Sequence, residues 1–192
     1  MTSYFRPAFV LVAIFTVLTG LAYPLAMTGL ANIAFPTSAG GSLIVRDGTV
    51  AGSRLIGQVF ASERYFHGRP SAAGQAGYDA AASSGSNLGP LSKKLLDRVA
   101  ADVASLREPG GGPVPADAVT TSASGLDPHI SPAYAELQVE RVAKARGVSP
   151  DRVRAIVAQN LDKPDFGLIG EERINVVLLN LALDAAFAPA SG

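Results

Sequence analysis

The first quarter of the chain differs from the rest in the pattern of its apolar and charged positions. Between Pro7 and Val45 no residue carries a charged side chain. Inside this stretch Ala8–Leu30 is almost continuously apolar, and about twenty helical residues cover the roughly 30 Å hydrocarbon core of a bilayer. We therefore predict that Ala8–Leu30 is a transmembrane helix, preceded by a short tail at residues 1–7 and followed by one domain at residues 31–192.

Two prolines and one basic residue bear on how this helix sits in a membrane. Pro24 is predicted to bend or end the regular helix, and Pro36 to close the segment, because proline lacks the backbone N–H. Arg6 and the α-amino group are positive charges near the N-terminal end, whereas the first residues after the span have none. The positive-inside tendency therefore predicts a cytoplasmic N-terminus and an extracytoplasmic domain. A cleaved signal peptide is the alternative, but the apolar stretch is long for one and Asn32 spoils the nearest cleavage site.

Small residues within the apolar segment offer a place for a second helix to approach. Thr16 and Gly20 are four residues apart, as are Ala22 and Ala26. Such pairs allow close helix packing in membranes, although a segment rich in alanine and glycine contains them readily by chance. Thr16 and Gly20 are therefore candidate contacts with a partner helix.

Strand signals follow the apolar segment. Asp47-Gly48 separates short runs at Leu43–Arg46 and Thr49–Ala51, and predicts a tight hairpin because glycine tolerates a positive φ. A further short strand is predicted near Arg54–Gln58. The Ser71–Gly89 stretch is dominated by alanine, glycine and serine and predicts a long loop. The side chains between these segments that are expected in the core are Val59, Phe60, Tyr65 and Phe66.

Apolar spacing and capping residues predict the helices of the second half. Leu91–Leu106 repeats apolar residues every three or four positions. Ser131-Pro132 starts a helix that runs through Arg146, and Ser149-Pro150 starts the next, because serine caps a helix and proline fits its first turn. Ile174–Leu183 is predicted to be a buried strand, with a helix as the alternative. Hairpins and helices without a βαβ repeat indicate the α+β fold class.

Composition and charge exclude several classes of function. Sixteen basic residues balance sixteen acidic ones, so charge gives no indication of nucleic-acid binding. The chain has no cysteine, which excludes disulfides, thiolate nucleophiles and cysteine-ligated zinc. Neither a P-loop nor a G-x-G-x-x-G turn between a strand and a helix occurs, so no segment is predicted to cradle nucleotide phosphates by itself.

The loop that contains Ser124, Asp127 and His129 is the main candidate for chemistry. A serine, an acid and a histidine so close together suggest a membrane-tethered hydrolase, with Ser86 as a second candidate nucleophile, but there is no G-x-S-x-G elbow. Asp127 and His129 could share a metal, for which no third ligand is evident. The other interpretations are a binding surface, or a loop that hydrogen-bonds its own backbone and caps the following helix.

Two further polar segments are candidates for binding. Ser86 and Asn87 lie in a loop directly before a helix, where backbone amides can meet an anion or a partner. His67 stands near Arg64 and Arg69, and these positive neighbours are expected to lower its pKa. A structural role for His67 is the simpler interpretation.

Four motifs occur in an order that resembles one known family. Each motif alone is weak, but the ordered set, with the apolar anchor, covers essentially the whole chain and resembles the potassium-transporting ATPase C subunit (KdpC) family. The motifs are Phe66–Ala72 (FHGRPSA), Ser83–Pro90 (SSGSNLGP), Val119–Pro132 (VTTSASGLDPHISP), and Phe166-Gly167 followed by Asn175–Asp184 (NVVLLNLALD).

The resemblance implies a non-catalytic accessory subunit of a bacterial inner-membrane complex that imports potassium at the expense of ATP. In that family a channel-like A subunit carries the ion, a P-type ATPase B subunit hydrolyses ATP, and a small F subunit belongs to the same complex. The C subunit is needed for assembly and activity, and is described as a catalytic chaperone that raises the ATP affinity of the B subunit. An extracytoplasmic domain cannot touch a cytoplasmic nucleotide, so no cofactor is expected on this chain, and ATP is expected to act only through the B subunit. Partner contacts are expected at Thr16, Gly20, Ser86, Asn87, Asp127 and His129.

Overall fold

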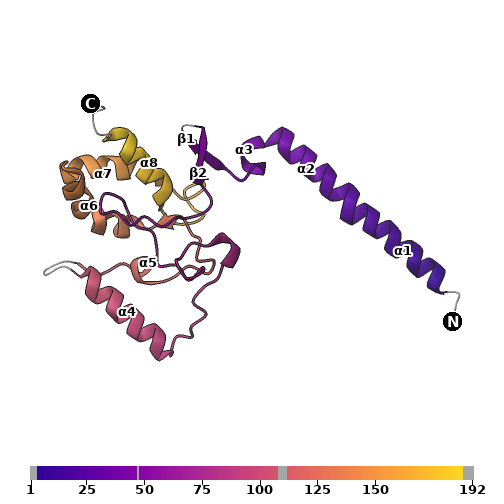
Figure 1. The fold of residues 1–192 in the computed structure, drawn as a ribbon, viewed down its shortest axis with the longest axis horizontal. Helices are drawn as coiled ribbons and strands as arrows, with labels where there is room; N and C mark the ends of the chain where they lie inside the picture. Colours follow the sequence, from indigo (N-terminus) through magenta and orange to yellow (C-terminus); the bar gives the residue numbers. More distant parts are fainter. Residues whose placement is uncertain (1–3, 47, 108–111, 188–192) are drawn as a thin grey trace. The chain divides into compact units, whose positions relative to one another are not determined.

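The computed structural model describes residues 4–46, 48–107 and 112–187. The chain forms two compact units, Met1–Ala51 and Gly52–Gly192. One long apolar helix comes first, and a mixture of short strands and helices follows (Figure 1). The predicted α+β class is therefore confirmed.

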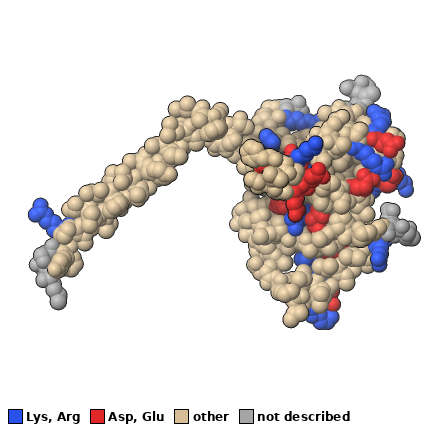
Figure 2. Space-filling view, turned by 180° about the vertical axis from the view of Figure 1, so that it is seen from behind, with Lys and Arg blue, Asp and Glu red and all other residues tan. Residues whose placement is uncertain are grey.

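A single apolar helix makes up most of the first unit. It consists of α1 (Phe5–Val17), one π-helical turn (Leu18–Ala22) and α2 (Tyr23–Ala34). Within these 30 residues an 18-residue stretch has a mean hydropathy of 2.1, and none of the helix residues is buried within the chain. Arg6, at the N-terminal end, is the one charged residue of Phe5–Ala34, and Figure 2 shows basic atoms at that end of the helix. Within the described residues this is the one helix long and apolar enough to cross a membrane, which agrees with the sequence prediction.

Pro24 lies inside this helix, so of the two predicted outcomes, a bend or an end, the helix does not end there. A proline ring clashes with the carbonyl of the fourth residue before it, which is Gly20. The π-helical turn includes Gly20, and such turns are a usual way to relieve a clash of this kind inside a continuing helix. The helix ends instead where Phe35 leaves helical geometry, with φ −139°, directly before Pro36 and the short helix α3 (Pro36–Ala39).

Strands β1 (Leu43–Arg46) and β2 (Thr49–Ser53) form the predicted two-stranded sheet. Gly48 has the positive φ, 77°, that the hairpin requires, while Asp47 lies outside the described residues. The strand predicted near Arg54–Gln58 is absent from the described residues. In its place Ser53 and Ile56 form one isolated bridge, and the Leu55 amide donates to the hydroxyl of Ser53, closing a tight turn.

The core of the second unit lies among three helices and a small sheet. The helices are α6 (Pro132–Arg146), α7 (Pro150–Gln159) and α8 (Val176–Ala186). The antiparallel sheet has the order β3-β5-β4, with β3 at His129–Ile130, β5 at Arg173–Asn175 and β4 at Leu161–Asp162. The buried side chains that fill the space between them include Phe66, Ile130, Ala135, Val139, Val142, Val153, Ile174, Leu179 and Leu183.

Helix α4 (Lys93–Leu106) matches the predicted amphipathic helix except at its start. Ser92, in extended geometry, is its N-terminal cap, so Leu91 lies outside the helix and is 93% exposed. Val99, Val103 and Leu106 are partly buried against the core, as their spacing predicts. Two short helical turns, Ala80–Ala82 and α5 (Ala116–Val119), complete the described elements.

The predicted strand at Ile174–Leu183 was wrong, and its alternative was right. Only Arg173–Asn175 is extended, after which Val176–Ala186 forms helix α8. The side chain of Asn175 accepts a hydrogen bond from the Leu178 amide at 3.2 Å, which caps the helix. A short apolar run buried on most sides has no periodicity that separates a strand from a helix.

Two buried carboxamides hold the irregular segment that precedes the site. Asn180 Oδ1 accepts from the Phe66 amide at 2.8 Å, and Asn180 Nδ2 donates to the Phe66 carbonyl at 2.9 Å. Gln138 does the same for the amide and carbonyl of His67, at 2.7 and 3.1 Å. These side chains replace the strand pairing that this buried backbone lacks.

Phe66 is fully buried as predicted, whereas Val59 is 60% exposed, against prediction.

Candidate functional site

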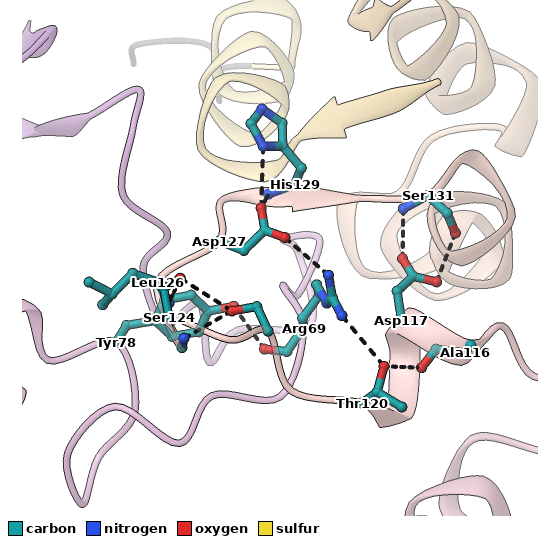
Figure 3. Close-up of polar contacts among 12 residues, drawn as sticks. Arg69, Tyr78, Ala116, Asp117, Thr120, Ser124, Leu126, Asp127, His129 and Ser131 are labelled. Atoms are coloured by element: carbon teal, nitrogen blue, oxygen red, sulfur yellow. Dashed lines mark hydrogen bonds and ion pairs between the residues drawn. The ribbon is translucent and has the colours of Figure 1, made fainter. Parts of the chain in front are cut away.

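A pocket of about 550 Å³ lies beside strand β3 in the second unit. Its walls come from segments far apart in the sequence: the segment after Phe66, helix α5, strand β3 and the residues that lead into β5 (Figure 3). Most of its polar lining side chains are charged. The lining residues are Arg69, Ala116, Asp117, Thr120, Asp127, His129, Ile130, Ser131, Glu171, Glu172 and Arg173.

Arg69 lines the pocket and contacts two other chain segments. Its Nη1 donates to Asp127 Oδ2 at 3.1 Å, and its Nη2 donates to Thr120 Oγ1 at 3.5 Å. Thr120 in turn donates to the Ala116 carbonyl at 2.7 Å, which closes a turn at the end of α5. The guanidinium therefore ties three chain segments together (Figure 3).

Asp127 joins Arg69 to His129. Its Oδ1 accepts from the backbone N–H of His129 at 3.0 Å and lies 3.3 Å from His129 Nδ1. Burial alone would raise the pKa of Asp127, but the two hydrogen bonds from His129 and the positive charge of Arg69 outweigh it and hold the pKa below its usual value. Asp127 is therefore ionised, and its charge is neutralised within the wall.

A second carboxylate fixes the start of helix α6. Asp117 accepts from the backbone N–H of Ser131 at 2.6 Å and from the Ser131 hydroxyl at 2.9 Å. That hydroxyl also accepts from the Tyr134 amide at 3.0 Å, so Ser131 caps α6 as the sequence predicts. Asp117 and Arg69 thus hold the two sides of the pocket.

Ser71 brings the glycine- and serine-rich segments together. Its hydroxyl donates to the Gly125 carbonyl at 2.6 Å and accepts from the Tyr78 amide at 2.8 Å. The Ser84 amide donates to the Ser124 carbonyl at 3.0 Å. Gly125 has φ 67° and no room for a side chain beside Ser84. The first three motifs therefore form one closed structure, which explains why they occur together.

The six predicted contact residues fall in three places. Asp127 and His129 meet in the pocket wall, whereas Ser86 and Asn87 do not line the pocket. Asn87 is exposed and has a positive φ of 51°. Thr16 and Gly20 lie on the apolar helix of the first unit, where a Cβ at Gly20 would meet only the Thr16 side chain.

Within the described residues the geometry does not assemble a serine–histidine–aspartate triad. The histidine ring contacts Asp127, but Ser124 Oγ is engaged by the Leu126 amide at 3.1 Å and lies 3.4 Å from Ser122 Oγ. Figure 3 shows the ring of His129 on the opposite side of Asp127 from Ser124. The described residues contain no group of three or more metal-ligating side chains. This arrangement is suited to holding loops and offering a charged surface.

The sequence alone did not single out Arg69, Thr120 or Asp117 as parts of one site. Arg69 stands in the FHGRPSA motif, but its partners lie more than 45 residues later in the chain. The sequence did show an arginine in one motif and an acid, Asp127, in another, and this was the one hint that the two could form an ion pair. Nothing in the spacing indicated that these two motifs pair.

His67 has the expected shift with a different main cause. Burial and then the positive charge of Arg141 lower its pKa, whereas the sequence pointed to Arg64 and Arg69. Its ring Nε2 lies 3.3 Å from the Ser62 carbonyl. His67 is therefore a neutral, packed histidine at ordinary pH.

Tyr78 is expected to be the last tyrosine to ionise. Burial, then the negative charge of Asp127, raises its pKa from 10.0 to about 12. Its hydroxyl donates to the Arg69 carbonyl at 2.8 Å, and a Cβ would collide with its ring at Gly57 and with its hydroxyl oxygen at Gly68. Because the folded state favours the neutral phenol of Tyr78, the raised pKa stabilises the folded chain. This stabilisation is complete below pH 10 and is lost as the pH rises towards 12.

A titration that follows tyrosinate absorbance should therefore show a final component near pH 12 in the wild-type chain. That component should disappear in Tyr78→Phe, while the components of the other four of the five tyrosines remain. An unchanged high-pH component in the variant would contradict the assignment.

Comparison with known proteins gives a consistent result over almost the full chain. A family model described as "KdpC: K+-transporting ATPase, c chain" matches residues 5–185. The potassium-transporting ATPase KdpC subunit of Caulobacter vibrioides is 60% identical, covering 98% of this chain and 96% of that protein. The KdpC subunit of Methylobacterium nodulans is 57% identical and covers 96% of this chain and 98% of its own length. That of Polaromonas naphthalenivorans is 55% identical and covers 96% of each chain. The motifs that close around Arg69, together with these matches, show that the chain belongs to the KdpC family of potassium-transporting ATPase subunits.

Proposed function

We propose that this chain is a non-catalytic accessory subunit of an ATP-driven potassium import complex in the bacterial inner membrane. Membership of the KdpC family over residues 5–185 is the single observation that carries the proposal. Its partners are a channel-like A subunit, a P-type ATPase B subunit and a small F subunit, and its role is the assembly and coupling of these chains.

The apolar helix supports anchoring in the membrane. Its 30 residues extend about 45 Å at 1.5 Å per residue, more than the hydrocarbon core needs. Arg6 at its start favours a cytoplasmic N-terminus and therefore supports an extracytoplasmic second unit. None of its side chains is buried within the chain, so the whole helix surface is available to lipid or to a partner helix.

The pairing of charges in the pocket supports a role without catalysis. Arg69 and Asp127 neutralise each other, and Asp117 is occupied by Ser131. With the second unit outside the membrane, ATP acts only through the B subunit, and any effect on its ATP affinity is transmitted through the complex. Thr16 and Gly20 on the helix, and Ser86, Asn87, Asp127 and His129 on the second unit, are the proposed partner contacts.

The test is co-purification of the tagged full chain from detergent-solubilised membranes of cells that produce the whole complex. We expect the channel-like and pump-like chains to accompany it, and the chain purified alone to hydrolyse no ATP. A thiol-labelling reagent applied to intact cells should reach an introduced Ser105→Cys, whose wild-type hydroxyl is exposed on α4. ATP hydrolysis by the isolated chain, or absence of companion chains, would overturn the proposal.

A further inference from the structure

The turn at residues 164–170 exposes a cluster of large apolar side chains at the surface of the second unit. Phe166 is 93% exposed, Leu168 88% and Ile169 65%. Exposed apolar side chains are ordinary when they are scattered, but three within four residues of one turn form a patch. We call Phe166, Leu168 and Ile169 the apolar tip.

The backbone of this turn is ordered by its own hydrogen bonds. The Asp165 amide donates to the Ile169 carbonyl at 2.9 Å, and the Leu168 and Ile169 amides donate to the Asp165 carbonyl at 3.1 and 3.0 Å. Asp165 and Ile169 also form an antiparallel bridge. The tip is therefore held in a defined shape before anything covers it, which lowers the entropic cost of docking.

Phe166 adopts a conformation that is unfavourable for a bulky residue. Its φ is 54°, in the left-handed region where glycine is the usual occupant. A glycine does follow at position 167, with φ 72°. The turn thus presents an aromatic side chain to the surroundings where a smaller residue would fit the backbone better, and strain of this kind is common at binding segments.

The charges beside the tip indicate what kind of surface it meets. Residues 162–173 contain four carboxylates and two basic residues. The exposed carboxylates are Asp162, Asp165, Glu171 and Glu172. An anionic bilayer surface would repel this acidic rim, and a two-fold pairing of two copies would set one acidic rim against the other. An apolar pocket bordered by lysine or arginine complements both parts of the surface.

We propose that the apolar tip docks into an apolar pocket with a basic border on a protein subunit of the same complex. This inference rests on the proposed function, and it adds a defined contact surface to it. Glu171 and Glu172 also line the charged pocket, so a partner seated on the tip would come close to Asp127 and His129. Phe166 would be its anchor, as buried aromatic side chains commonly are at interfaces.

The proposal is tested first by photo-cross-linking in the assembled complex. The full chain carries benzoylphenylalanine in place of Phe166 and is produced with its companion chains, and membranes are irradiated. We expect an adduct with a different protein chain of the complex, mapped to an apolar segment flanked by lysine or arginine. Adducts with lipid alone, adducts with a second copy of this chain, or the absence of any adduct would overturn the proposal.

The second measurement is the affinity of the purified chain for its companion chains in detergent. Phe166→Ser combined with Leu168→Ser should weaken binding at least about tenfold, as loss of an anchor does. Leu96→Ser, on an α4 residue that is 58% exposed, is the matched control and should bind like wild type. All three chains should melt at the same temperature by circular dichroism, because these side chains are exposed.

The outcomes separate the two proposals. If the wild-type chain brings down no transport subunits, the proposed function itself fails. If the wild-type chain binds them and the double variant binds equally well, only the docking of the apolar tip is wrong. Cross-linking needs just one substitution at an exposed position, so it remains decisive even if the double variant folds poorly.

Discussion

Asp184→Ala is expected to lower the free energy of unfolding of the second unit by about 3 kcal/mol, because it leaves a buried arginine without its carboxylate. The Arg146 side chain is 1% exposed, and its Nη2 lies 3.0 Å from Asp184 Oδ1. Asp184 Oδ2 also accepts from the Tyr65 hydroxyl at 3.0 Å, and the Arg146 guanidinium stacks 5.1 Å from the centre of the Tyr65 ring. Urea unfolding of the full chain in detergent, followed by the near-ultraviolet circular dichroism of its tyrosines, measures the loss.

The exposed ion pair between Asp151 and Arg154 is the control. Asp151 is 92% exposed, so Asp151→Ala should change the free energy of unfolding by less than about 1 kcal/mol. The double variant Arg146→Met with Asp184→Ala removes the buried arginine charge together with its partner and should be more stable than Asp184→Ala alone. Equal stability of Asp184→Ala and wild type would show that the buried pair contributes nothing.

Asn180→Ala is the second large effect, with an expected loss of about 2–4 kcal/mol, because two buried backbone groups lose their partners at once. Asn180 is 1% exposed and serves both the amide and the carbonyl of Phe66. Asn180→Asp should also destabilise, since it keeps the acceptor for the Phe66 amide but sets an oxygen against the Phe66 carbonyl. The same urea experiment measures both variants.

Asn160 provides the comparison for this prediction. Its Nδ2 donates to the Ile156 carbonyl at 2.9 Å within its own helix end, so Asn160→Ala should cost under about 1 kcal/mol. Hydrogen exchange gives an independent check, because the amide of Phe66 should exchange much faster in Asn180→Ala and remain protected in Asn160→Ala. Continued protection of that amide in Asn180→Ala would contradict the assigned role.

Local patterns predicted the elements that depend on few neighbours. The apolar helix follows from length and hydropathy, helix α6 from Ser131-Pro132 and Gly147, and the hairpin from the glycine at position 48. Each of these signals lies within the element it specifies. Capping and turn geometry are satisfied locally, which is why the sequence was sufficient.

The sequence predictions were wrong or ambiguous where contacts with residues distant along the chain determine the local structure. A strand was predicted near Arg54–Gln58, but the Arg54 carbonyl instead accepts a hydrogen bond from Asn175 Nδ2 at 2.8 Å. Ile174–Leu183 was ambiguous because burial on most sides removes the periodicity that separates strand from helix. Val59 and Leu91 are apolar but exposed, and nothing in their near neighbours distinguishes them from core residues.

By itself the sequence determined that the chain has one apolar, membrane-compatible helix, an α+β body and a set of motifs that belong together. Only the tertiary structure decided that Arg69 pairs with Asp127, that Asn180 and Gln138 replace strand pairing for Phe66 and His67, and that the apolar tip stays outside the core. The physical reason is that hydropathy and capping act between near neighbours, whereas ion pairs and buried hydrogen bonds join residues that are distant along the chain. Their partners exist only once the chain has folded.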